Sequence, residues 1–417
     1  MNPAATPRPD IDNVRKLIAA LGTAGRTTQG GITRMTYSPE YRRGMELTTT
    51  AMREAGMEVS IDAIGNLVGT YAGKDPALPA VMSASHLDTV PEGGELDGAL
   101  GVAVAIACVR TWHQAGWCPR RTVKVVATVE EEGNLFGLGC FGSRAMAGEL
   151  EGKSPEEFKD AQGRTLSWHL QQIGLTPEKA LQAAKVDPRD IACYVELHIE
   201  QGEELDLSGT PCAVVTDIAG IDRHWVEITG NANHAGTTRM DRRQDALVAA
   251  AAVVSEVNRR AVASNGQYVA TVGKLDVSPN ATNIIPGRVR LVIETRSPKP
   301  EVLEATHTDI PGMLNDIGTR FGVRVELIRR LYAQPVPLHA SMIAALQAAA
   351  EQAGVQASLL PSWAGHDAKI MTTIVPTGMI FVPSLKGISH SPLEATRWED
   401  IDEGLKLLDQ ALRNLAA

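Results

Sequence analysis

The chain has 417 residues, a formal net charge of −9 and 44% hydrophobic residues, which is an ordinary globular composition. This length predicts two or three domains with a large core. The acidic balance argues against nucleic acid or an anionic membrane as the main partner, and the 4% of aromatic residues argues against base-stacking platforms. No stretch approaches the roughly 18 apolar residues of a membrane-spanning helix.

The cysteines and the N-terminal residues indicate the cellular compartment in which the protein is expected. The five cysteines are an odd number without a C-x-x-C pair, which argues against a disulfide framework and against a thiolate zinc site. The opening residues MNPAATPRPDIDNVRKL contain no apolar core of a secretory signal. We therefore expect a reduced, cytoplasmic protein.

Apolar periodicity in the first half of the chain predicts an α/β domain. Helices are expected over 10–23 and 39–55, followed by a helix of small apolar residues after Asp97. A more polar, helical stretch over 151–190 indicates a surface excursion. Strands are expected over 58–61, 66–71, 81–84, 122–129 and 192–197.

The pattern changes at about Val214. Strand, helix, strand, strand, helix and strand follow one another, an order that predicts a small α+β, ferredoxin-like unit. These elements are expected over 225–228, 241–263, 267–275, 288–295, 301–319 and 323–328, and the chain then returns to helix, strand and helix over 340–353, 378–382 and 399–416. We predict a catalytic α/β domain with a mixed sheet, formed by 1–213 and 331–417. The inserted domain would span 214–330, with Pro211 and Pro335 near the crossings.

The stretch from Ser83 to Gly101, SASHLDTVPEGGELDGALG, connects a predicted strand end to a predicted helix start. His86 and Asp88 follow the strand at alternate positions, and Asp97 precedes the helix. Open α/β sheets form their sites at such junctions, so a histidine and a carboxylate there can bind a metal. The alternative is a surface loop with a solvated His86 and a capping Asp97.

Other predicted strand ends carry the same residue types. Three glutamates at 130–132 follow the strand over 122–129, His198 ends the strand in ELHIEQG, and His390 lies in GISHSP. Two histidines and three carboxylates suit zinc, manganese, cobalt or nickel, and the further histidine and carboxylate allow two ions. A nearby glutamate would pass a proton from water to a leaving nitrogen. The alternatives are a solvated acidic turn, a core histidine and a loop-capping histidine.

Seven ordered motifs resemble the amidase or hydantoinase-type branch of the dinuclear metallopeptidase superfamily. That branch contains N-carbamoyl-L-amino acid hydrolases, β-ureidopropionases and allantoate amidohydrolases. The motifs are HLDTVPEGGELDGALGV, EEEGNLFGLGCFGSRAMAG, ELHIEQG, NANHAGTTRM, PNATNIIPGRVRL, AGHDA and GISHSP. The resemblance covers about residues 12–412, and it is far more specific for the branch than for the substrate.

The resemblance implies two divalent metal ions per subunit. One ion would take His86, Asp97 and His198, and the other would take Asp97, Glu132 and His390, so that Asp97 bridges the pair. His198 is informative because the peptidase-like relatives usually have an acidic residue at that position.

The resemblance also implies catalytic roles. Glu131 would be the general base, and Asp88 would hydrogen-bond His86 and fix its ring. The inserted domain resembles a lid and dimerisation domain. Its His234 would stabilise the oxyanion, coming from the partner subunit of a homodimer.

Five positions are implied to contact the substrate. Asn283 and Arg296 would grip a substrate carboxylate, since the planar arginine fork bonds a carboxylate bidentately. Gln201 would contact the substrate from the catalytic domain, and Gly365 and His366 would line the same pocket. An ordinary salt bridge remains the alternative for Arg296, and a purely structural role remains the alternative for His366.

The chain departs from the branch pattern at three places. Trp363 stands where a glycine is usual, Ile221-Asp222 stands where the turn usually has a glutamine, and Arg239 replaces a proline. The implied metal ligands are all intact. The departures therefore leave hydrolysis unaffected and put the substrate in question.

The leading hypothesis is a metal-dependent amidohydrolase that cleaves the carbamoyl C–N bond of N-carbamoyl-L-amino acids through a hydroxide bridging the metals. The products would be the amino acid, carbon dioxide and ammonia. Allantoate, β-ureidopropionate or another N-acyl amide suited to Trp363 are alternative substrates. A dipeptidase and a silent binding protein are alternatives of another class. His198 argues against the first, and the complete ligand set argues against the second.

Overall fold

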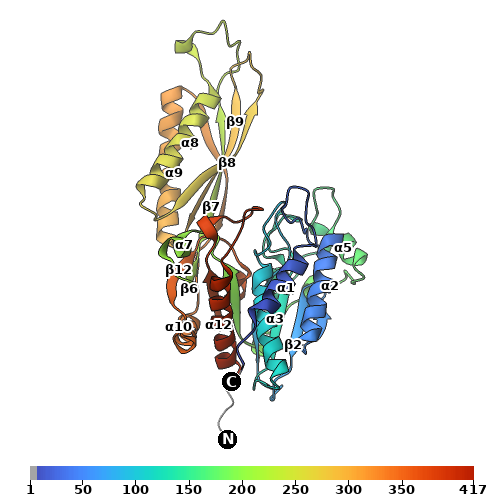
Figure 1. Cartoon of the computed structure of the whole chain (residues 1–417). Coiled ribbons are helices and arrows are strands. Elements are labelled where there is room, and N and C mark those ends of the chain that lie inside the picture. The colour runs from blue at the N-terminus through green and yellow to red at the C-terminus, as the bar shows by residue number, and fades with distance from the viewer. Residues whose placement is uncertain (1–6) are drawn as a thin grey trace. The chain divides into compact units, whose positions relative to one another are not determined.

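The computed structural model describes residues 7–417, which form two compact units (Figure 1). The first unit contains the chain through Thr216 together with Leu338–Leu360 and Ala364–Ala417. The second contains Asp217–Pro337 and Pro361–Trp363. Both divisions lie a few residues beyond those expected from the sequence. The reason is that strand β6 (Cys212–Ile218) runs through the first division and pairs there with β11 (Val336–Pro337).

The first unit is built on a mixed nine-stranded sheet, which confirms the predicted α/β class. The strand order is β1-β2-β4-β3-β5-β13-β6-β11, with β12 paired to β6. Neighbouring strands among β4, β3, β5 and β13 are parallel, and the outer strands pair antiparallel. The remaining strands are β1 (Glu58–Ile61), β2 (Leu67–Tyr71), β3 (Ala80–His86), β4 (Val123–Thr128), β5 (Ile191–Ile199), β12 (Ala357–Ser362) and β13 (Thr377–Val382).

Helices cover this sheet, and the most buried of them is α3 (Ala99–Gln114), whose small apolar residues are buried almost all round. Trp112 of α3 donates its indole N–H to Asp409 of α12 (Trp398–Leu415) over 2.6 Å. The other helices are α1 (Ile11–Leu21), α2 (Pro39–Glu54), α4 (Phe141–Ala147), α5 (Leu166–Gln172), α6 (Ala180–Ala183), α7 (Glu204–Ser208), α10 (Ala340–Ala353) and α11 (Asp367–Met371), with 3₁₀ turns at Pro155–Glu157, Pro188–Asp190 and Leu385–Gly387.

The parallel strands bring distant parts of the sequence to one edge of the sheet. Strands β3 and β13 are buried along their whole length, and β5 is buried except for one partly exposed residue. Their nearly continuous apolar sequences reflect a sheet that is covered on both faces. In the register, His86 pairs with Thr128 of β4, and His198 pairs with Phe381 of β13. The carboxyl ends of β3, β4, β5 and β13 therefore lie next to one another.

The second unit is a four-stranded antiparallel sheet with two helices. Its strands are β7 (Gly220–Thr229), β8 (Val269–Ser278), β9 (Arg288–Ser297) and β10 (Arg324–Ala333), in the order β10-β7-β9-β8. Its helices are α8 (Ala246–Ala263) and α9 (Pro300–Phe321). Helix α8 starts later than expected because Met240–Arg242 forms a separate 3₁₀ turn, and because the Asp245 side chain caps the N–H groups of Leu247 and Val248.

Within residues 7–417, none of the helices combines the length and the apolar character that crossing a bilayer requires.

Candidate metal centre

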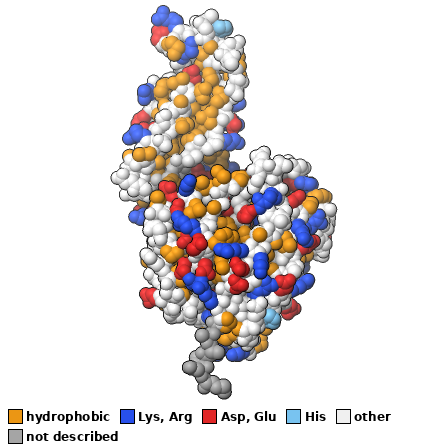
Figure 2. Space-filling model, in the orientation of Figure 1, with side chains coloured by type: hydrophobic (Ala, Val, Ile, Leu, Met, Phe, Trp, Pro, Cys, Tyr) orange, Lys and Arg blue, Asp and Glu red, His pale blue; other side chains and the backbone are white. Residues whose placement is uncertain are grey.

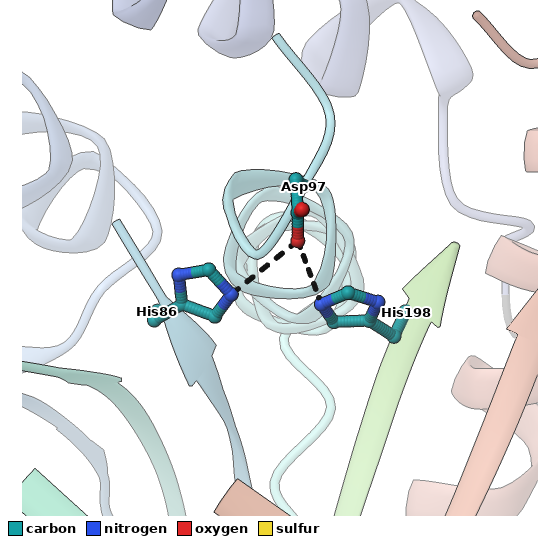
Figure 3. Close-up of side chains that lie close together, drawn as sticks. All are labelled: His86, Asp97 and His198. Carbon is teal, nitrogen blue, oxygen red and sulfur yellow. Dashed lines mark ion pairs between the residues drawn. The ribbon is translucent and has the colours of Figure 1, made fainter. Parts of the chain in front are cut away.

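Two histidines converge on one oxygen of Asp97. His86 ends β3, His198 lies near the end of β5, and Asp97 precedes α3, so that the three side chains point toward one another (Figure 3). The distance to Asp97 Oδ1 is 3.5 Å from His86 Nε2 and 3.1 Å from His198 Nε2. All three residues are buried. Gly98 permits this approach, since it has a positive φ of 67° and a Cβ there would overlap the His86 ring.

The second oxygen of Asp97 faces a different pair of residues. His390 Nε2 lies 3.1 Å from Asp97 Oδ2 and 3.5 Å from Glu132 Oε1. Asp97 therefore takes part in two potential ligand groups, one through each oxygen. A carboxylate shared in this way is the arrangement that a pair of cations needs.

The outer nitrogens of two rings fix which nitrogen faces Asp97. His86 Nδ1 donates to the backbone carbonyl of Asp88 over 3.0 Å, and His198 Nδ1 donates to that of Ile199 over 2.9 Å. Each ring is thereby held with Nε2 toward Asp97. Metal-binding histidines typically have such an outer hydrogen bond.

The Asp88 side chain makes a different contact from the one expected. Its Oδ1 lies 3.7 Å from His86 Nδ1, and the hydrogen bond to that ring comes from the Asp88 backbone instead. The carboxylate accepts the backbone N–H groups of Glu131 (3.2 Å) and Glu132 (3.1 Å). Asp88 thus orients the turn that carries the two glutamates, because its side chain points past the ring toward the end of β4.

Burial dominates the electrostatics of the acidic groups. It raises the pKa of Glu132 to about 7, with a further contribution from the Asp97 charge, and it raises the pKa of Glu131 well above its ordinary value. Burial acts in the same direction on Asp97, yet hydrogen bonds from His198, His390 and His86 hold the pKa of Asp97 well below its ordinary value. In the metal-free protein the site therefore holds protons that cations would displace.

The residues present fit a pair of divalent cations. Glu132 Oε1 is buried and accepts no hydrogen bond from any residue within 7–417. The donors are imidazole nitrogens and carboxylate oxygens, the set that zinc, manganese, cobalt and nickel accept. Backbone strain also concentrates here, since Glu130, Gln201 and His390 have positive φ angles of 56°, 60° and 53°.

The predicted substrate residues of the first unit lie at this centre or beside it. Gln201 donates its side-chain amide to Asp97 Oδ2 over 3.0 Å, and the same nitrogen is 3.3 Å from His390 Nε2. His366 is buried edge-on against His198, with ring centroids 4.6 Å apart. Gly365 is exposed.

The other predicted substrate residues belong to the second unit. His234 and Asn283 are neighbours, since Ala235 N–H donates to the Asn283 carbonyl over 3.0 Å. His234 Nδ1 accepts the N–H groups of Gly236 and Thr237 at 3.0 and 3.2 Å, which leaves Nε2 as the protonated nitrogen. His234 is exposed and its Nε2–H can donate.

Arg296 takes part in an ion cluster on its own unit. Its Nε donates to Glu294 over 2.8 Å, and its Nη1 donates to the Trp363 carbonyl over 3.2 Å. Arg223 donates to the same Glu294 carboxylate over 2.5 Å. Two guanidinium groups share one carboxylate, so the cluster keeps a net positive charge.

Several residues near the centre were not singled out from the sequence. Cys140 Sγ donates to Glu131 Oε1 over 3.3 Å, and Asp367 accepts the Ser143 hydroxyl over 2.5 Å. The Glu394 carboxylate accepts the backbone N–H groups of Leu96 and Asp97. A signal existed for Glu394, four residues after His390. Cys140 and Asp367 lie in the motifs EEEGNLFGLGCFGSRAMAG and AGHDA, but the sequence did not indicate that tertiary packing brings their side chains to the centre.

Comparison with known proteins identifies the family. Residues 82–414 match the family model described as peptidase family M20/M25/M40. The chain belongs to this family. It is 40% identical over 400 residues to an N-carbamoyl-L-amino acid amidohydrolase of Geobacillus stearothermophilus, covering 95% of this chain and 96% of the relative. It is 34% identical to an allantoate amidohydrolase of Bacillus subtilis strain 168, covering 97% and 98%.

The fold of this chain is similar to that of a solved structure over nearly the whole length of both chains. The crystal structure of an amidase of the hydantoinase/carbamoylase family from Burkholderia multivorans has a TM-score of 0.89 and 31% identity, covering 98% of each chain. The resemblance found in the sequence motifs is thus confirmed. So is the predicted class, a hydrolase of linear C–N bonds.

Proposed function

We propose that this M20 protein hydrolyses the carbamoyl C–N bond of N-carbamoyl-L-amino acids, with two divalent cations held by His86, Asp97, Glu132, His198 and His390. The observation that carries the proposal is the position of Asp97. One of its oxygens faces His86 and His198, and the other faces His390. Cations bound there would polarise the carbamoyl carbonyl and lower the pKa of a water molecule.

Glu131 is proposed as the general base. Its Oε2 lies 3.9 Å from His86 Nε2, so the carboxylate borders the ligand groups, and its backbone is held by Asp88. Burial raises the pKa of Glu131, which makes its carboxylate a stronger acceptor of a proton from water, and the resulting acid can deliver that proton to the leaving nitrogen. The products are the amino acid and carbamic acid, which decomposes to carbon dioxide and ammonia.

His234 is proposed to stabilise the negative charge that develops on the carbonyl oxygen. Two backbone N–H groups donate to its Nδ1, which leaves Nε2–H as the donor that this exposed ring can offer. A fixed donor of this kind is what an oxyanion requires. Asn283, on the adjacent loop between β8 and β9, would also contact the substrate.

The positive cluster around Arg296 is proposed to hold the substrate carboxylate. Arg296 and Arg223 carry two positive charges, and the Glu294 carboxylate that they share carries one negative charge. The remaining positive charge can therefore balance that of a bound carboxylate. Gln201, Gly365 and His366 of the first unit are also proposed to contact the substrate.

A homodimer is proposed, with His234 acting across subunits. Strand β8 lies at the edge of its sheet, and exposed apolar side chains such as Val269 and Leu275 lie along it. Helix α8 adds exposed Val248 and Val262, and hydrophobic side chains form a band on the visible face of this unit (Figure 2). Long exposed edge strands are rarely left unpaired, which favours a second copy as the partner.

We infer a reducing, cytoplasmic location from the thiols. All five cysteines are free, and four of them are buried. The chain therefore uses no disulfide for stability.

A substrate panel tests the proposed reaction. With added Mn²⁺, ammonia release is measured on N-carbamoyl-L-amino acids, their D-enantiomers, allantoate and β-ureidopropionate, and release of the free amino acid is measured on N-acyl amino acids, whose hydrolysis gives no ammonia. The proposal expects the highest kcat/KM for an N-carbamoyl-L-amino acid. A higher value for allantoate would assign the second candidate, which the Bacillus subtilis relative favours. No hydrolysis of any compound by a metal-loaded protein would reject the enzyme.

A further inference from the structure

Glu394 connects two loops that carry proposed metal ligands. Its Oε1 accepts the backbone N–H groups of Leu96 and Asp97, each over 3.0 Å. Its Oε2 accepts the Ser389 hydroxyl over 2.9 Å. Asp97 and Glu394 are 297 positions apart in the chain. A single carboxylate therefore holds the segment before α3 against the loop that carries His390.

The absence of a side chain at Gly94 leaves the space that the Glu394 side chain occupies. A Cβ at Gly94 would overlap the Glu394 carboxyl, so the loop can approach it only with glycine at that position. Ser389 lies between the two acids, 3.4 Å from Asp97 Oδ2 and 2.9 Å from Glu394 Oε2. The contacts thus reach the carboxylate of Asp97 as well as its backbone.

The position of Glu394 is costly for a group with only a packing role. Glu394 is partly buried, and its Oε2 lies on the same Ser389 hydroxyl that approaches Asp97 Oδ2. A partly buried carboxylate beside a second carboxylate is unfavourable unless something compensates it. Cations at Asp97 would supply that compensation.

We propose that Glu394 is a positioning residue, which fixes Asp97 and His390 relative to each other so that two cations can bind. In the loop before Asp97, Gly93 is tied to Ile32 by two backbone hydrogen bonds, and Glu394 holds the following segment at Leu96 and Asp97. Holding it by two backbone hydrogen bonds lowers the entropy lost when the ligands close on a metal. This inference rests on the proposed metal centre.

The test measures Zn²⁺ binding to metal-free protein, in competition with a chromophoric chelator. Glu394→Ala is expected to weaken binding about 10- to 100-fold, the usual effect of removing a group that orients a ligand. Glu394→Gln keeps an oxygen that accepts from Leu96 and Asp97, so it should stay within a few-fold of wild type. Glu399→Ala is the control, because Glu399 is an exposed carboxylate five positions away.

A second variant reaches the same contact from the other side. Gly94→Ala displaces the Glu394 carboxyl by steric overlap and should weaken Zn²⁺ binding similarly. It also serves as the test if Glu394→Ala does not fold.

The outcomes separate this inference from the metal centre itself. Wild-type protein that binds no Zn²⁺ at the five ligands would reject the proposed function. Wild-type protein that binds two ions, with Glu394→Ala and Gly94→Ala binding them equally tightly, would overturn only the role of Glu394. A loss in Glu394→Gln as large as that in Glu394→Ala would also overturn it, since the hydrogen-bond geometry would then not be the cause.

Discussion

Asp88 Oδ2 accepts the backbone N–H group of Glu132 over 3.1 Å, although the two residues are 44 positions apart in the chain. The other oxygen of Asp88 accepts the N–H group of Glu131. The Asp88 backbone carbonyl meanwhile holds the His86 ring. One residue therefore sets the orientation of a proposed ligand on β3 and of the proposed base and ligand after β4.

Asp88→Asn should lower kcat about 10- to 100-fold, because one of the two backbone N–H groups would face an amide NH₂ instead of an oxygen. Circular dichroism should show a folded protein, and kcat is measured with saturating metal. Asp316→Asn, an exposed change on α9, is the control. Wild-type kcat in Asp88→Asn would mean that the turn is held by other contacts.

Glu131→Gln should reduce kcat by roughly 10²- to 10⁴-fold, the range expected for losing a general base. Metal content should be unchanged, since Glu131 is not a proposed ligand. The measurement pairs steady-state kinetics with elemental analysis, and Glu351→Gln on the exposed side of α10 is the control. A near-wild-type rate would remove Glu131 from the mechanism.

Metal binding should release protons and become tighter as pH rises from 6 to 8. The pKa of Glu132 is about 7 in the metal-free protein, chiefly through burial, and the hydrogen bond to Asp97 raises the pKa of His390. Below these pKa values both groups carry protons, which a cation must displace, so affinity falls as pH falls. Calorimetric titration in two buffers of different ionisation enthalpy counts the protons. A pH-independent affinity with no proton release would contradict this assignment.

Mixed subunits test whether His234 acts across a dimer. Glu131→Gln and His234→Ala proteins should each be inactive, and re-formed mixtures should recover about a quarter of wild-type activity, since half the dimers are hybrids with one complete site. Size-exclusion chromatography verifies the dimers. If the mixtures stay inactive while hybrid dimers form, His234 acts within its own subunit, and full activity of His234→Ala by itself would remove His234 from the mechanism.

Three of the proposed ligands could be placed together from the sequence because they lie at strand ends or a helix start, which parallel strands bring together, whereas His390 lies in the loop between β13 and α12. His86, Asp97 and His198 follow this rule directly. The side-chain contacts of Asp88 could not be predicted, since alternation along a strand does not say which neighbour a carboxylate meets. Strand β12 and the division within β6 were also missed, because the sequence has no break where one sheet continues through a domain crossing.

Metal content measured together with activity tests the central claim most directly. Wild-type protein is dialysed against a chelator, its Zn and Mn are quantified, and hydrolysis is followed as either ion is restored. The account predicts no turnover in the metal-free protein and recovery that saturates at two ions per chain, with Asp97→Asn failing to recover. Full turnover by protein that contains no metal, or by Asp97→Asn, would contradict it.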